Sequence, residues 1–146
     1  MYFVDRNKIE QTLTYLEKLT KAFTEQDSFQ NMTEQLALER AAHMMVESMI
    51  DVGNAMIDGF IMRDPGSYED IIDILEDETV ITTDMAKQLK VVIGLRKMLV
   101  QEYTSIHHEE IEQTLTENIQ SVQQFPTSIR TYLENELGPV SAFIPE

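Results

Sequence analysis

The sequence predicts an all-α fold, an antiparallel bundle of five to six helices within a single domain of residues 1–146. In every informative segment, apolar residues recur at steps of three and four, as on one face of an α-helix, and no segment alternates as a half-buried strand does. The 146 residues are 42% hydrophobic, which is enough for one domain with a substantial core. The connections between the segments are short, which favours antiparallel neighbours.

Capping residues define the first two helices. Asp5 can cap a first helix that reaches about Gln26. The inner face of this helix carries Ile9, Leu13, Leu16 and Phe23. Asn31, followed three residues later by Glu34, resembles a capping box, so a long second helix begins there. We expect that helix to end near Arg63, because a proline and a glycine follow at once.

The second helix carries two apolar stripes, so neighbouring helices should cover more than one of its sides. The stripes are Met45, Met49, Val52, Met56 and Phe60, and Val46, Ile50, Gly53 and Ile57. A polar line runs between them, formed by Glu47, Asp51, Asn54 and Asp58. Two interpretations of this line remain open: a solvated face, or a face from which Asp51 or Asp58 meets Arg96 across a cleft.

Hydroxyl residues predict the next two helices. Ser67 begins a short third helix with Ile71, Ile72 and Leu75 on its apolar face. Thr82 or Thr83 caps a fourth helix, and Asp84 is favourably placed in its first turn. The apolar period of this helix continues as far as Tyr103, so we expect one continuous helix to that residue.

Proline and glycine limit the last helices. A fifth helix is expected from about His108 to Gln124, with Pro126 as its stop. Thr127 then begins a short sixth helix, which Gly138 closes.

Arg96 interrupts the apolar stripe of the fourth helix. The stripe consists of Met85, Leu89, Val92, Arg96, Leu99 and Tyr103. A guanidinium cannot lose its charge, and burying it without a partner costs several kcal/mol. Arg96 therefore needs a carboxylate, a phosphate or a wet cleft. A structural ion pair with a neighbouring helix and an anion-binding site are both consistent with the pattern.

Residues 94–103, GLRKMLVQEY, resemble the signature of the HepT-like branch of the HEPN superfamily. That signature is an Arg, four intervening residues, a His, one residue and a Tyr. Residues 51–54 are similar to the family's second-helix motif, and residues 65–75 are similar to its segment with Ser67 and Tyr68. The resemblance covers nearly the whole chain.

The resemblance implies a metal-independent endoribonuclease, often the toxin of a pair whose antitoxin is a small nucleotidyltransferase. It implies neither a metal nor a cofactor, and it implies a homodimer with the sites at the interface. Cleaving RNA through its own 2′-hydroxyl needs a base, an acid and a cation for the phosphorane charge. The family pattern gives Arg96 the phosphate role. It gives Tyr103 a supporting role, or the role of acceptor for AMP transferred by the antitoxin.

Gln101 stands where the family has its catalytic His. An amide forms hydrogen bonds but cannot exchange a proton near neutral pH. Loss of a general acid or base typically costs about 10² to 10⁴ in rate, so ribonuclease activity is expected to be weak or lost. The alternative function is a non-catalytic homodimer, formed through the second and fourth helices, that binds a protein or a nucleotide.

Two other histidines are weighed as substitutes. His107 lies eleven residues after Arg96, too far along one helix, although a twofold partner subunit can supply it. It is otherwise an exposed residue at a helix start. His43, on the second helix, is interpreted as a satisfied core or interface histidine.

Composition excludes several classes of function. The chain has no cysteine and a formal net charge of −15, so thiolate chemistry is excluded and RNA must meet a local positive site. That site is sought at Lys87, Lys90, Arg96 and Lys97. No segment has the length of a membrane span and no signal peptide is visible, so we expect a cytoplasmic protein.

Overall fold

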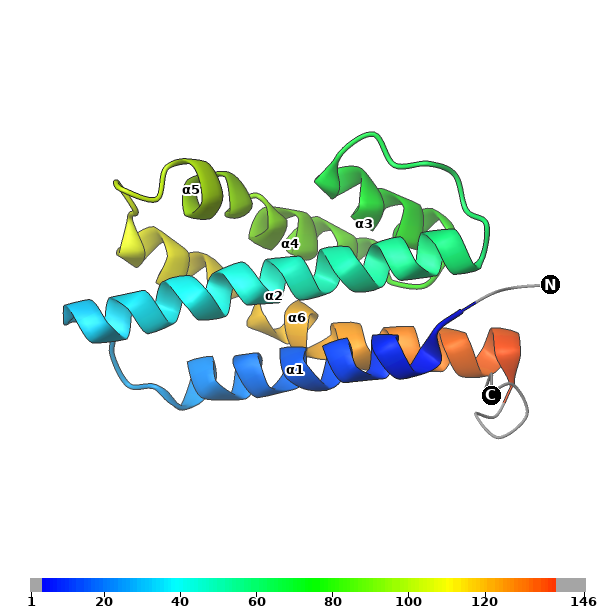
Figure 1. The fold of residues 1–146 in the computed structure, drawn as a ribbon, viewed down its shortest axis with the longest axis horizontal. Coiled ribbons are helices and arrows are strands. Elements are labelled where there is room, and N and C mark those ends of the chain that lie inside the picture. The colour runs from blue at the N-terminus through cyan, green and yellow to red at the C-terminus, as the bar shows by residue number, and fades with distance from the viewer. Residues whose placement is uncertain (1–3, 139–146) are drawn as a thin grey trace.

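The computed structural model describes residues 4–138, which form six helices and no strand. The predicted all-α bundle is therefore confirmed (Figure 1). The helices are α1 (Arg6–Glu25), α2 (Met32–Gly59), α3 (Tyr68–Asp77), α4 (Thr83–Ile93), α5 (Arg96–Gln101) and α6 (His108–Leu137). None of the helices within the described residues combines the length and the apolar character that a membrane crossing requires.

Helix α2 occupies the centre of the bundle. It packs against α1 on one side, against α3 and α5 on another, and against α6 behind (Figure 1). Both predicted apolar stripes of α2 are buried, which confirms that it is covered on several sides. At Gly53 the approach of α3 is close enough that an added Cβ would collide with the Ile71 side chain.

Four predicted helix starts are confirmed by their capping hydrogen bonds. In each case a side-chain oxygen accepts from the backbone N–H three residues later, which satisfies one of the free donors of the first turn. The capping residues are Asp5 on α1, Asn31 on α2, Ser67 on α3 and Thr82 on α4. The capping box of α2 is complete, because Glu34 also accepts from the Asn31 backbone at 3.2 Å.

Helix α2 ends at Gly59, and the expected end near Arg63 is wrong. The Met62 N–H bonds to the Ile57 carbonyl at 2.9 Å, and Ile61 adopts a positive φ of 55°. This is the pattern of a Schellman termination, which usually places glycine at the left-handed position. The sequence does not indicate this helix end, because the β-branched Ile61 occupies the position where glycine is usual.

The expected continuous helix through Arg96 to Tyr103 is also wrong. Helix α4 ends at Ile93, and Arg96 begins the separate short helix α5. Between them the Leu95 N–H bonds to the Val92 carbonyl at 3.0 Å, a three-residue step typical of a 3₁₀ turn. Gly94 favours the break, because glycine costs about 1 kcal/mol inside a helix.

Pro126 does not stop the last helix, so the two helices expected there are one. Helix α6 runs through Pro126 without interruption. The missing N–H costs about 3 kcal/mol. Burial of large apolar side chains on both sides of the proline, each worth about 1.5 to 3 kcal/mol, offsets that cost. These side chains are Ile111, Leu115, Val122, Phe125, Ile129 and Leu133. Gly138 closes α6 with a φ of 79°, as predicted.

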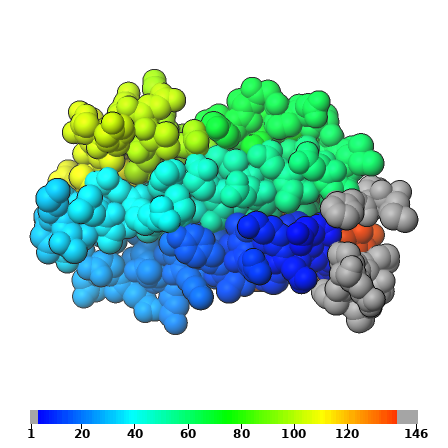
Figure 2. Space-filling view, in the orientation of Figure 1, coloured from blue at the N-terminus to red at the C-terminus, as the bar shows by residue number. Residues whose placement is uncertain are grey.

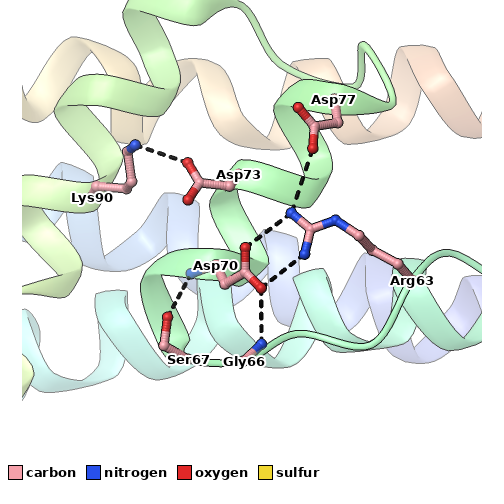
Figure 3. Close-up of polar contacts among 7 residues, drawn as sticks. All are labelled: Arg63, Gly66, Ser67, Asp70, Asp73, Asp77 and Lys90. Carbon is pink, nitrogen blue, oxygen red and sulfur yellow. Dashed lines mark hydrogen bonds and ion pairs between the residues drawn. The ribbon is translucent and has the colours of Figure 1, made fainter.

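Polar contacts fix α3 against its neighbours (Figure 3). The guanidinium of Arg63 donates to both oxygens of Asp70 at 2.9 Å, and it also contacts Asp77. Lys90 on α4 pairs with Asp73 at 2.8 Å. These contacts hold the first turn of α3 close to α2, and that turn carries Tyr68.

Candidate functional site

Arg96 forms an ion pair with Glu47 where α5 meets α2. Its Nε donates to Glu47 Oε1 at 2.8 Å, and the two side chains are 24% and 28% exposed. This hydrogen bond is the main reason that the pKa of Arg96 is raised above its ordinary value. The predicted need of Arg96 for a carboxylate or a cleft is therefore met first by a carboxylate.

Of the two interpretations of the polar line, the solvated face describes Asp51 and Asp58, and within residues 4–138 Arg96 meets the line at Glu47 instead. Both side chains are exposed, and they border a groove shared with Lys8 of α1. Burial is the main cause of a raised pKa at Asp51. Because α5 is a separate helix, it meets α2 at Glu47, one turn before Asp51.

Tyr68 provides an aromatic surface for the same guanidinium. The Arg96 Cζ lies 4.3 Å from the centroid of the Tyr68 ring, and Tyr68 remains 44% exposed. Such a cation–π contact is worth about 0.5 to 1 kcal/mol at an exposed position. The site therefore joins α5, α2 and α3, and Figure 2 shows the surface dipping between α5 and α3 over the middle of α2.

His43 is the residue that sequence reasoning did not place here. It lies one helical turn before Glu47, and its Nε2 is 3.5 Å from Glu47 Oε1. This is the same oxygen that accepts from Arg96. The four-residue spacing of His43 and Glu47 was readable as a shared helix face. The sequence could not predict that Arg96 meets this face, because the meeting depends on the break between α4 and α5.

Gln101 and Tyr103 lie at the far end of α5 from Arg96. Gln101 is the last residue of α5 and is exposed, and Tyr103 follows in the next turn with 68% exposure. Within residues 4–138, neither side chain has a polar contact with Arg96. On a helix, positions 96 and 101 point about 140° apart, so one subunit does not bring the three signature residues together.

The remaining histidines lie at the start of α6. His107 is 74% exposed and 3.6 Å from Glu110 of its own helix, so it is an exposed residue within this subunit. His108 contacts Glu39 of α2 at 2.6 Å and is 23% exposed.

Two of the four cations weighed as an RNA patch are already paired with carboxylates. Lys90 is already paired with Asp73 (Figure 3), whereas Lys87 and Lys97 are exposed. Within the described part of the chain, no group of three or more His, Asp or Glu side chains has the arrangement of a metal site.

The guanidinium of Arg96 keeps its phosphate-binding end available. Its Nε is used by Glu47 and one face lies against Tyr68. Among residues 4–138, no side chain or carbonyl accepts from Nη1 or Nη2. A fork of two N–H donors is the geometry that binds a phosphate through two parallel hydrogen bonds.

The family model described as ribonuclease HepT-like matches residues 9–129. The chain belongs to this family. The YutE protein of Bacillus subtilis (strain 168), described provisionally as an RNase, is 50% identical over 143 residues, which are 98% of this chain and 99% of that protein. The solved structure of B. subtilis YutE, described as a cytosolic protein of unknown function, matches with a TM-score of 0.95 at 50% identity. This match covers 98% of this chain and all of that one.

A more distant solved structure shares the fold. A tri-AMPylated HEPN toxin of Shewanella oneidensis, solved in complex with MNT antitoxin, matches with a TM-score of 0.72 at 22% identity. The match covers 90% of this chain and 99% of that one. At this identity the likeness concerns the fold.

Proposed function

We propose that this HepT-like protein is a metal-independent RNA endonuclease with a weakened site, in which Arg96 binds the phosphate to be cleaved. The observation that carries this proposal is that the Arg96 guanidinium is held in place while its two Nη groups are left without an acceptor among residues 4–138. Glu47 and Tyr68 orient it through Nε and one face, and both Nη groups remain available. Family membership supplies the class of reaction.

Cleavage requires a base for the 2′-hydroxyl proton, an acid for the leaving oxygen and a cation at the phosphate. The 2′-hydroxyl of the RNA attacks the adjacent phosphorus, and a cation stabilises the charge that builds on the phosphoryl oxygens. Arg96 can supply two N–H donors for those oxygens. Gln101 cannot transfer a proton, so this position does not provide the base or the acid.

The proposal includes two protein partners. We propose a homodimer formed through α2 and α4, and a nucleotidyltransferase antitoxin that transfers AMP to Tyr103. The high exposure of the Tyr103 ring supports access by a second protein. A cytoplasmic location follows the cytosolic description of its B. subtilis relative.

The test compares Arg96→Ala with Arg130→Ala. Both variants remove a partly exposed guanidinium that is paired with acids, but Arg130 lies between α6 and α1, away from the proposed cleft. With single-stranded RNA or tRNA and a chelator present, Arg96→Ala should lower the cleavage rate by about 10² or more. It should also weaken binding of an uncleavable 2′-O-methyl RNA, measured by fluorescence anisotropy, whereas Arg130→Ala should change neither.

Two results would count against the nuclease. Equal cleavage by Arg96→Ala and the wild type would remove Arg96 from the site. RNA binding that depends on Arg96, without cleavage by the wild type, would favour the alternative, a non-catalytic binding module. The observation that favours this alternative is Gln101, which cannot transfer a proton at the position of the family's His.

A further inference from the structure

His43 places an imidazole beside Arg96, where the signature position offers only an amide. We propose that His43 is the proton-transfer residue of this site, taking the place of an imidazole at position 101. The proposal rests on the proposed ribonuclease function and assigns a residue on α2 to a step that Gln101 cannot perform.

The first support is a shared contact atom. Glu47 Oε1 accepts from Arg96 Nε at 2.8 Å and lies 3.5 Å from His43 Nε2. The guanidinium and the imidazole therefore flank one carboxylate oxygen. Glu47 thereby places the imidazole beside the guanidinium, so we expect the 2′-hydroxyl of an RNA whose phosphate is bound by the Nη groups of Arg96 to come within reach of that ring.

The second support is that, among residues 4–138, no hydrogen bond occupies the imidazole ring of His43. A separation of 3.5 Å exceeds the range of about 2.7 to 3.2 Å for N–H···O hydrogen bonds. No other residue between 4 and 138 hydrogen-bonds to His43. Its side chain is 33% exposed, so substrate can approach it, while the partly buried Glu47 limits its movement.

The other two histidines do not meet these conditions. His107 lies at the start of α6 and, among residues 4–138, contacts neither Glu47 nor Arg96, and His108 is held by Glu39 at 2.6 Å. The chain has three histidines in all, and of these His43 alone shares a contact atom with Arg96.

The charged and titratable groups around His43 come from several helices. Glu47 on its own helix and Arg96 from α5 are the groups joined to it through one oxygen. Tyr68 from α3 lies beyond the guanidinium. Glu39, one turn earlier on α2, is engaged by His108 of α6.

The step balances without a further reactant. The neutral imidazole of His43 takes the 2′-hydroxyl proton as the 2′-oxygen forms its bond to phosphorus. The bond from phosphorus to the 5′-oxygen breaks, and that oxygen takes a proton from solvent water. The products are a 2′,3′-cyclic phosphate and a 5′-hydroxyl, and His43 returns its proton to solvent.

The test uses His43→Gln, with His107→Gln as the matched control on an exposed histidine. His43→Gln should lower cleavage by about 10² or more while binding of 2′-O-methyl RNA is kept. It should also remove the dependence of the rate on pH between about 5 and 8 that an imidazole confers. Adding Gln101→His to His43→Gln should restore part of the rate, and His107→Gln should behave as the wild type.

A second measurement uses the unmodified protein, so it does not depend on how the variant folds. Binding of 2′-O-methyl RNA should shift the imidazole NMR signals of His43 and leave those of His107 in place. Unshifted His43 signals would overturn the proposal, as would a slower His43→Gln that keeps the wild-type pH profile.

The outcomes also separate this proposal from the one on which it rests. Cleavage that needs Arg96 but is unaffected by His43→Gln overturns the role of His43 and leaves the ribonuclease in place. Absence of cleavage by the wild type overturns both.

Discussion

Glu47 organises the candidate site by holding Arg96 through one nitrogen only. The pair is partly exposed, and exposed pairs are worth about 0.2 to 1 kcal/mol. Its contribution to stability is therefore small. The more important consequence is orientation, because Nε is engaged by Glu47 while no side chain or carbonyl among residues 4–138 accepts from the two Nη groups.

A substitution at Gln101 tests what the signature position has lost. Gln101→His should raise metal-independent RNA cleavage by about 10² or more over the wild type, because an imidazole can exchange protons near neutral pH. The gain should depend on pH between about 5 and 8 and should vanish when Arg96→Ala is added. Gel assays with single-stranded RNA and tRNA measure both effects.

The control for Gln101→His is Gln113→His, which puts an imidazole at an exposed position of α6. This variant should cleave no faster than the wild type. If Gln101→His is equally slow on both RNA types, with and without a chelator, then the site has lost more than its histidine and the binding module becomes the better description.

The sequence predicted that Arg96 needs a partner, but it did not identify the partner. A charge within an apolar stripe shows that desolvation must be compensated. Which acid compensates it depends on where α5 crosses α2. Tyr68, Glu47 and His43 lie 28 to 53 residues before Arg96 in the chain, so helical periodicity does not indicate that they meet it.

At the scale of elements, the predictions succeeded where one side chain decides the outcome and failed where packing decides it. Asp5 and Asn31 cap helices through bonds within four residues, so they are visible in sequence. Pro126 was predicted to break a helix by the same local logic. Its cost is local but its compensation comes from burial along the whole of α6, which a local pattern cannot report.

Helix α6 is joined to α1 by an ion cluster on the far side of α2 from α5. Arg130 donates to Glu10 at 2.6 Å and to Glu17 at 2.9 Å. These hydrogen bonds are the main reason that the pKa values of both carboxyls lie below their ordinary value of 4.5. The cluster therefore links the stability of the bundle to pH.

Arg130→Met should lower the free energy of unfolding at pH 7 by about 0.5 to 1 kcal/mol, since all three side chains are a third or more exposed. Both folded-state pKa values are depressed, so this stabilisation is present above about pH 4.5 and is lost as pH falls through them. Urea unfolding at several pH values should show the wild type and the variant converging in acid.

Lys21→Met supplies the comparison for this cluster. Lys21 lies 3.8 Å from Glu25 within α1, and both side chains are more than half exposed. Its replacement should change stability little at any pH. A gap between Arg130→Met and the wild type that persists unchanged to pH 3 would show that Arg130 acts through packing of its aliphatic stem.

At the scale of the whole molecule, the net charge of −15 affects every association. It opposes nucleic acid over most of the surface, so RNA binding depends on the local field at Arg96. It also opposes the proposed homodimer, in which two acidic chains meet. Exposed Asp51 and Asp58 on α2 contribute to this negative charge.

Dimerisation should therefore strengthen as salt rises. Between about 0.01 and 0.15 M salt, the Debye length falls from about 30 to about 8 Å, which screens repulsion between the two chains. Sedimentation equilibrium should show a dissociation constant several-fold lower at the higher concentration. At pH 5, closer to the sequence pI of about 4.4, the salt effect should shrink because the chains carry less charge. A dimer that salt weakens would instead depend on opposite charges paired across the interface, and a chain that remains monomeric throughout would require all residues of the site to come from one subunit.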